Sequence, residues 1–165
     1  MSPDITVRHA AASDWEVLVA FNRAMALETE GKVLDEAVVS RGVAGLLANP
    51  SLGFYVVAES AGEVVGSLMI TTEWSDWRAG EFWWVQSVYV RPDSRRRGVY
   101  SRLYTFVQDM ADRAPDVCGF RLYVERENST AQQAYKAMGM EKTNYVIFEY
   151  VKNTDRLPPL TPRDT

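Results

Sequence analysis

The sequence predicts a mixed α/β (α+β) domain in which helices cover a central, largely antiparallel sheet. The early part of the chain changes from helical spacing of apolar residues to alternating, strand-like spacing. A later segment, residues 81–124, places a strand, an arginine-glycine loop, a helix and a second strand in succession. Such a crossover joins two parallel strands, usually with a right-handed connection. In 165 residues, 47% of them hydrophobic, one globular core is expected.

The first third of the chain predicts one short strand and two helices. Residues 5–8 alternate as a strand does, and Ser13 with Glu16 has the spacing of a capping box that begins a helix. Apolar residues at helical spacing continue this helix to about residue 29, and Gly31 is a stop signal. Asp35 is the cap expected for a second helix, which ends before Asn49 and Pro50.

The remainder predicts most of the sheet. Strands are expected at residues 54–59, 64–73 and 81–90, the first two joined by a tight turn. A helix at 101–113, a strand at 118–124, a short helix at 130–138 closed by Gly139 and a last strand at 144–151 follow. We therefore expect a domain over residues 1–151 and a Pro-rich, disordered C-terminal tail over residues 152–165.

Charge and cysteine content exclude several classes of function. The formal net charge of -4 provides no basic field for a nucleic acid backbone, so no nucleic acid partner is expected. Cys118 and His9 are the only residues of their types, which leaves no basis for a disulfide, a zinc cluster or a Cys/His catalytic pair, and no metal is expected. Without an apolar leader or a run of about 20 apolar residues, we expect a cytoplasmic protein with no membrane partner.

The sequence RRRGVYS, residues 95–101, is the strongest chemical signal in this acidic chain. A glycine loop that opens a helix points free backbone N–H groups at one spot, where the helix dipole adds partial positive charge. Such a position suits a phosphate, and arginines can strengthen its binding. The alternative is that the three arginines are merely solvated. The spacing matches neither a P-loop nor a dinucleotide fingerprint, which disfavours ATP and NAD.

Two motifs in the expected order resemble those of the GNAT family of N-acetyltransferases. They are R-x-x-G-x-Y at residues 95–100 and N-x-x-A-x-x-x-Y-x-x-x-G-M at residues 128–140, and the resemblance covers about residues 5–151. It implies acetyl-coenzyme A as cofactor, about six or seven strands with a splayed parallel pair at the centre of the sheet, and about four helices. Tyr100 departs from the family pattern, which usually has Gly or Ala there.

The resemblance also implies which residues bind the cofactor. The backbone of the strand before the loop would run beside the pantetheine arm, the loop amides would hold the pyrophosphate, and an asparagine would bond the pantetheine. The asparagine has an alternative role as a helix cap. These cofactor-binding positions are Val88, Tyr89, Val90, Arg95, Arg96, Arg97, Gly98, Val99, Tyr100, Ser101 and Asn128.

Acetyl transfer to an amine requires stabilisation of an oxyanion, a proton for the leaving thiolate and removal of a proton from the amine. By resemblance, a backbone N–H of residues 88–90 serves the oxyanion and Tyr135 is the acid; its alternative is aromatic packing. The glutamate of some family members falls here on Trp84, which cannot accept a proton. Glu73 is therefore the candidate catalytic base, Glu28 a second candidate, and an ordered water chain remains open.

The acceptor is expected to be an amine of a small molecule or a protein. Tryptophans near the predicted acceptor site, together with carboxylates at nearby element ends, favour a small cationic amine, although an aromatic core is the alternative explanation. We assign substrate binding to Glu28, Trp84 and Gln86. A homodimer is frequent in the family, and a non-catalytic acyl-coenzyme A binding or sensing domain remains the alternative function. The tryptophans and carboxylates are Trp74, Trp77, Trp83, Trp84, Glu28, Glu30, Glu73 and Asp76.

Overall fold

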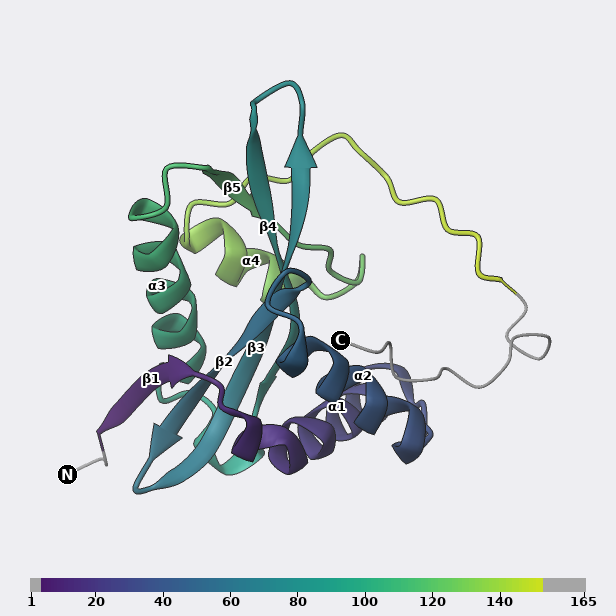
Figure 1. Cartoon of the computed structure of the whole chain (residues 1–165), viewed down its shortest axis with the longest axis vertical. Coiled ribbons are helices and arrows are strands. Elements are labelled where there is room, and N and C mark those ends of the chain that lie inside the picture. Colours follow the sequence, from purple (N-terminus) through teal and green to yellow (C-terminus); the bar gives the residue numbers. More distant parts are fainter. Residues whose placement is uncertain (1–3, 153–165) are drawn as a thin grey trace. The chain divides into compact units, whose positions relative to one another are not determined.

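The computed structural model describes residues 4–152. They form two compact units, residues 4–121 and residues 122–152. The first unit contains the sheet and three helices, and the second contains one short helix (Figure 1). No helix within the described residues is both long and apolar enough to cross a membrane. The predicted Pro-rich tail lies outside the described residues from position 153 onward.

The sheet of the first unit has five strands in the order β1-β2-β3-β4-β5. All neighbouring strands are antiparallel except β4 and β5, which are parallel. This confirms the predicted mixed, largely antiparallel fold, but with five strands in the described part rather than six or seven. The parallel pair consequently lies at one edge of this sheet and not at its centre. The strands are β1 (Ile5–His9), β2 (Gly53–Ser60), β3 (Glu63–Ser75), β4 (Gly80–Val90) and β5 (Val117–Arg121).

Helix boundaries follow the sequence signals with one exception. Helix α1 ends at Gly31, whose φ of 63° is left-handed, and the Asp35 carboxylate accepts a hydrogen bond from the N–H of Val38 at the start of α2. The predicted capping box of Ser13 and Glu16 is wrong, because residues 12–14 form a short 3₁₀ turn and Asp14 is the cap residue of α1. The helices are α1 (Trp15–Glu30), α2 (Glu36–Ala48), α3 (Val99–Asp112) and α4 (Ser129–Ala137), with a second 3₁₀ turn at Pro92–Ser94.

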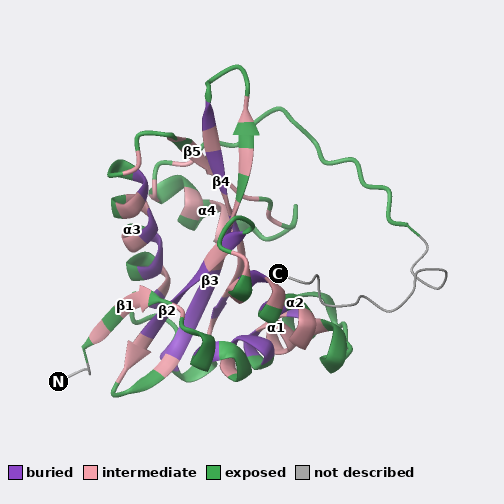
Figure 2. Ribbon diagram, in the orientation of Figure 1, coloured by how far each residue is buried: buried purple, intermediate pink, exposed green. Residues whose placement is uncertain are grey.

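Helices cover both faces of the sheet, and the alternation of strand residues decides which helix each side chain meets. Tyr55 and Val57 of β2 pack in one core cluster with Leu18 of α1 and Leu46 of α2. The alternate residue Phe54 faces the other way and contacts the ring of Trp83, on the face that α3 covers. Buried residues accordingly lie in the central strands and along the helices that cover them, α1 and α3 among them (Figure 2).

The predicted last strand, residues 144–151, does not form within the described residues. The segment has no strand assignment, and six of its large apolar side chains are between 62% and 93% exposed. Apolar residues occupy both alternating positions, so the pattern selects neither a face nor a register, and a strand forms only where another strand pairs with it. Residues 122–124, predicted to extend β5, are likewise outside that strand.

An ion-pair network joins β1, β2 and the start of α1. The guanidinium of Arg8 donates to both oxygens of Asp14, at 2.7 and 3.0 Å, and to Glu59 at 2.7 Å. Asp14 is only 6% exposed, and its carboxylate also accepts from the N–H of Ala11. The hydrogen bond from Arg8 is the main reason why the pKa of Asp14 is lowered from its ordinary 3.8. The network fixes the turn that leads into α1.

We expect Asp14→Asn to lower the free energy of unfolding by about 1.5–3 kcal/mol, because a charge-assisted bidentate pair is lost. The folded pKa lies below the unfolded one, so this contribution is complete above about pH 4 and disappears as the pH falls through the folded pKa. Urea unfolding at several pH values measures the difference. Glu63→Gln, which breaks an exposed pair with Arg91, is the control and should cost under about 1 kcal/mol. Equal losses for the two variants would contradict the prediction.

Candidate anion loop and acyl-transfer site

The arginine-glycine loop meets the N-terminus of α3 in an unusual backbone conformation. Gly98 has a φ of 75° and Arg96 a φ of 63°, both in the left-handed region that favours glycine. The cap residue of α3 is Gly98, which has no side chain to cap the helix. The first N–H groups of any helix lack a partner within the helix itself, and at the start of α3 these groups follow directly on the arginine-glycine loop. This local geometry fits an anion that accepts hydrogen bonds from backbone amides.

Arg95 connects this loop to α1. Its Nε donates to the carbonyl of Val90 at 2.9 Å and a terminal nitrogen donates to Glu28 at 2.6 Å. The guanidinium also lies 5.7 Å from the ring centroid of Tyr89. Burial, and then the Glu28 carboxylate, raise the pKa of Tyr89. Both Arg95 and Glu28, predicted to bind cofactor and acceptor respectively, are thus already paired with each other.

A bulge interrupts β4 just before the loop. The register shifts so that Ser87 and Val88 together oppose Leu68 of β3, and Ser87 has a φ of 50°. On its other side, β4 pairs with β5 only from Glu81 to Trp84. Within the described residues the ladder ends there, so residues 85–90 have no β5 partner along that side. Unpaired backbone groups inside a sheet require a ligand or water, which is the property expected of the predicted cofactor strand at residues 88–90.

Glu73, the candidate base, lies in a polar cluster that spans three neighbouring strands. One carboxylate oxygen accepts from the indole N–H of Trp84 at 2.5 Å, and the other accepts from Arg121 at 2.8 Å. The Arg121 guanidinium also lies 3.7 Å from the ring centroid of Phe82. Gln86 follows Trp84 on the same face of β4, as the alternation predicts. Trp84 and Glu73 are thus brought together, whereas Glu28 belongs to the Arg95 pair.

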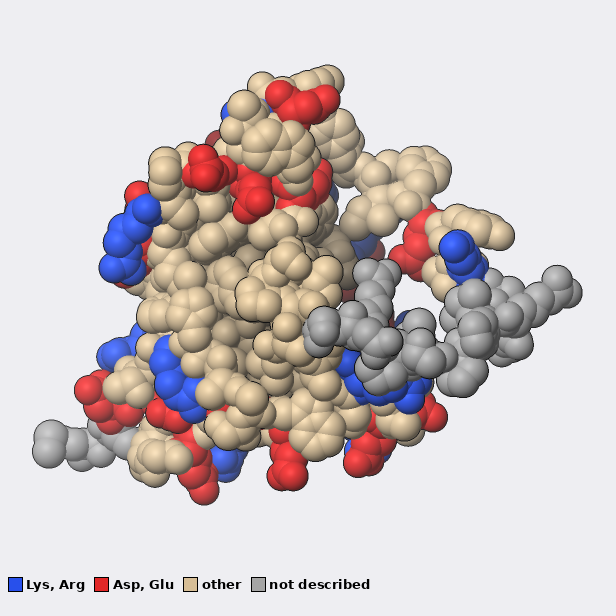
Figure 3. All heavy atoms as spheres, viewed as in Figure 1, with Lys and Arg blue, Asp and Glu red and all other residues tan. Residues whose placement is uncertain are grey.

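The four tryptophans of the predicted acceptor wall do not form one cluster. Trp83 is only 7% exposed and packs between Phe54 and Phe120, so it belongs to the core. Trp74 and Trp77 are 63% and 85% exposed on the β3–β4 hairpin. Acidic side chains gather over that end of the molecular surface in the view of Figure 3.

The second unit contains Asn128 and Tyr135. The side chain of Asn128 accepts from the N–H of Ala131 at 3.1 Å, so the alternative role as a cap of α4 is real. Tyr135 is half-buried in α4, and burial raises the pKa of its phenol above the ordinary value of 10.0. A phenol in this state stays protonated at neutral pH and can serve as a proton donor.

Sequence reasoning missed three residues that shape this region. Arg121 completes the Glu73 cluster, and its only signal was a cation inside an otherwise apolar strand. Ser87 forms the bulge, and nothing in its neighbourhood of apolar residues signals a left-handed residue. Gly66 allows α3 to approach β3: a methyl group there would lie 2.9 Å from Cγ1 of Val99 and 3.1 Å from the carbonyl oxygen of Tyr89.

The fold and the loop together define a class of α/β proteins in which a glycine loop opens a helix beside an interrupted parallel strand pair. Comparison with known proteins makes the class specific. Residues 15–140 match the profile of the Acetyltransferase (GNAT) family, which is most of the chain. The chain belongs to this family. No curated protein matches it significantly.

Solved structures agree with the assignment. A possible acetyltransferase from Clostridium difficile 630 is 40% identical, with a TM-score of 0.85 over 90% of this chain and 97% of that one. A predicted acetyltransferase with acetyl-CoA from Clostridium acetobutylicum is 18% identical, with a TM-score of 0.73 over 89% and 96% of the two chains. AAC(6')-Iy in complex with the bisubstrate analog CoA-S-monomethyl-acetylneamine is 18% identical, with a TM-score of 0.72 over 90% and 99%. The last two show the fold alone.

We expect Gly66→Ala to destabilise the protein by about 1–3 kcal/mol and to weaken coenzyme A binding, because the added methyl forces the first turn of α3 away from β3. Gly45→Ala, in the interior of α2 with no atom near the added methyl, is the matched control. It should leave binding unchanged and stabilise by about 0.5–1 kcal/mol. Urea unfolding and calorimetric titration with coenzyme A measure both effects. Unchanged coenzyme A affinity in Gly66→Ala would contradict the role given to this contact.

Proposed function

We propose that this protein is an acetyl-coenzyme A dependent N-acetyltransferase that transfers acetyl directly to a primary amine of a small molecule or a protein. One observation carries the proposal beyond family membership: the amide-rich loop at α3 follows directly on a strand whose pairing with β5 stops after Trp84. A phosphate-bearing head and an extended arm would each find backbone donors there.

Acetyl-coenzyme A is the donor used in this family, and the local geometry of the first unit fits it. The loop N–H groups from Arg97 to Tyr100 would hold the pyrophosphate, and the backbone of residues 88–90 would hold the arm and the acetyl carbonyl. The left-handed φ of Gly98, the cap residue of α3, is a conformation that favours glycine at this position of the loop. When bound, the cofactor supplies an acetyl thioester. The structures with acetyl-CoA and with a CoA bisubstrate analog, which share the fold, support this choice.

Transfer replaces the carbon–sulfur bond of the thioester with a carbon–nitrogen bond. The amine nitrogen gives up one proton, and the departing sulfur gains one. We assign the proton that the sulfur gains to the Tyr135 phenol. Burial raises the pKa of this phenol, so it is neutral and still carries its proton at neutral pH. A backbone N–H of the bulged segment of β4, residues 87–90, would stabilise the charge on the acetyl oxygen.

The proton lost by the amine has two candidate acceptors, Glu73 and an ordered water. Both oxygens of Glu73 already accept hydrogen bonds, from Arg121 and Trp84, so neither oxygen is left uncommitted to receive the proton of an amine directly. This arrangement favours removal through water, with Glu73 orienting Trp84 on the face of β4 that also bears Gln86. We keep Trp84 and Gln86 as acceptor-binding residues, and Glu28 as one that acts through its pair with Arg95.

We propose a small cationic amine as the acceptor. Acidic side chains gather at the hairpin end of the molecule (Figure 3), and exposed indoles of Trp74 and Trp77 lie on the same hairpin. Carboxylates attract a cation over a distance, and an indole face binds an ammonium group. A thiol-release assay with acetyl-coenzyme A across cationic, neutral and anionic amines tests the class. Turnover of only neutral or anionic amines would reject it, and release with none would favour a non-catalytic acyl-coenzyme A binding domain.

We expect Tyr135→Phe to lower kcat by about 10²–10³-fold with little change in coenzyme A affinity, because the phenol acts as a proton donor rather than as a binding group. For the wild type, kcat should fall as the pH rises through the raised pKa of the phenol, above about pH 10. The variant should lack this high-pH limb. The measurements are kcat against pH and calorimetric titration with coenzyme A. Tyr145→Phe, an exposed tyrosine outside both motifs, is the control. An equal fall in kcat and in affinity would mean that Tyr135 is structural.

A further inference from the structure

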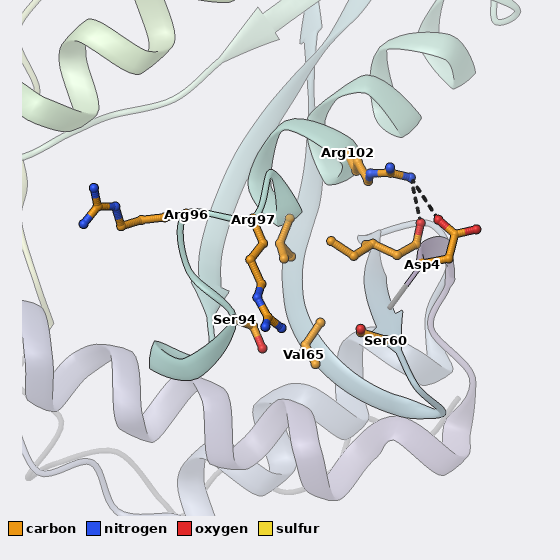
Figure 4. A pocket seen from close by; sticks show the side chains of 9 residues that line it. Asp4, Ser60, Val65, Ser94, Arg96, Arg97 and Arg102 are labelled. Carbon is orange, nitrogen blue, oxygen red and sulfur yellow. Dashed lines mark hydrogen bonds and ion pairs between the residues drawn. The ribbon is translucent and has the colours of Figure 1, made fainter. Parts of the chain in front are cut away.

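A cavity of about 420 Å³ lies beside the first turn of α3, on the side that faces the start of β1 (Figure 4). Its walls come from β1, from the β2–β3 turn region, from the arginine loop and from α3. All of them belong to the first unit. The residues that line it are Asp4, Ile5, Ser60, Val65, Ser94, Arg96, Arg97, Val99 and Arg102.

The charge of this cavity is predominantly positive. Three of the lining residues are arginines and one, Asp4, is acidic. In Figure 4 the guanidinium of Arg97 lies in the cavity, and that of Arg96 points away from it. The same view places Arg102 beside Asp4 on the opposite wall. Two cationic residues from different elements therefore line the same cavity.

The two arginines differ in how their charges are satisfied. Arg102 donates to the carbonyl of Ile5 at 2.9 Å and lies 3.8 Å from an oxygen of Asp4, which leaves most of its five N–H donors for another acceptor. Within the described residues, Arg97 makes neither a hydrogen bond nor an ion pair. Its charge helps to lower the pKa of Asp93, a shift caused chiefly by hydrogen bonds from Arg91 and Ser94. Within the part of the chain that the structure describes, the donors of Arg97 are therefore not committed to a hydrogen-bonded counter-ion.

The remaining walls suit an oxyanion attached to a small organic group. The Ser60 hydroxyl lines the cavity and can donate to an oxyanion. Ser94 is 5% exposed and already donates its hydroxyl proton to Asp93, so it provides no donor for that group. Val65 and Val99 provide apolar surface between the polar groups. A phosphate with three or four oxygens can accept from two guanidinium groups and a hydroxyl at once.

We propose that this cavity binds a phosphate group through Arg97 and Arg102, separately from the backbone amides of the loop. The phosphate could come from two sources that share this chemistry: the 3′-phosphate of bound coenzyme A, or a free phosphate compound. The proposal does not rest on the transferase activity, since binding alone is required. Charged guanidinium groups, rather than amides, provide the recognition here.

The test is calorimetric titration of the full chain with inorganic phosphate. Arg97→Gln and Arg102→Gln should each weaken phosphate binding about tenfold, because each removes a charge-assisted pair. Arg102→Lys keeps the charge but loses the guanidinium donors, so it should weaken phosphate binding, though less than Arg102→Gln does. Arg113→Gln, the same change at the far end of α3, is the matched control and should have no effect. Thermal unfolding checks that every variant is folded.

Asp4 provides a test of opposite sign. Asp4→Asn removes the one acidic group of the cavity, so phosphate should bind several-fold more tightly than to the wild type. Unchanged affinity in Asp4→Asn together with unchanged affinity in both glutamine variants would overturn the proposal.

Titrations of protein saturated with a coenzyme separate the two sources. If phosphate binds the complex with dephospho-coenzyme A but not the complex with coenzyme A, the cavity takes the 3′-phosphate. If phosphate binds both complexes, the cavity serves a separate ligand. If it binds neither, the phosphate seen with free protein occupied the loop amides, and the proposal is wrong. None of these outcomes depends on whether an amine is acetylated, so failure of the proposed activity would be recognised separately.

Discussion

The short pairing of β4 with β5 is the constraint on which the candidate site depends. The parallel ladder covers only Glu81 to Trp84, and beyond it β4 bulges at Ser87 and then turns into the arginine loop. The bulge places a residue that is not glycine in the left-handed region, which destabilises the fold by roughly 1–3 kcal/mol. Such strain persists only where the surrounding structure holds the residue in that conformation. What the bulge provides is a stretch of β4, residues 85–90, that has no β5 partner within the described residues and that lies next to a helix N-terminus. The buried ring of Trp83 packs between the rings of Phe54 and Phe120 and so fixes the half of β4 that pairs with β5. The other half of β4 continues without that partner.

The position of α3 relative to that strand rests on close contact rather than on charge. Gly66 lets the side chain of Val99 lie against β3, and Val99 is only 2% exposed. Arg95 then ties the loop back to β4 through the Val90 carbonyl and to α1 through Glu28. A change in α1 would therefore reach the loop through one ion pair, about 40% exposed on each side, which contributes little stability but does fix geometry.

Local sequence signals predicted most of this structure, and long-range contacts explain the rest. The periodicity of β2, β3 and β4 and the stop at Gly31 are properties of neighbouring residues, so they could be read directly. The last strand could not be placed, because its two apolar faces are defined only by a partner strand. The capping box failed since Asp14 accepts two hydrogen bonds from Arg8, six residues earlier, and one from the N–H of Ala11, which stabilise this turn more than a local cap by Ser13 would. The loop was found from its motif, whereas the Glu73–Arg121 pair joins residues 48 apart that no local pattern relates.

The three consecutive arginines have three different environments, so they do not act as one group of positive charge. Their side chains leave the loop in different directions and meet different surroundings. Arg95 pairs with an acidic helix residue, Arg96 occupies a left-handed conformation with its side chain directed away from the cavity, and Arg97 enters the cavity beside Ser94. The guanidinium groups thus diverge although the three residues are consecutive. An acidic protein can in this way concentrate positive charge in one loop and still divide it between an ion pair with α1 and a neighbouring cavity.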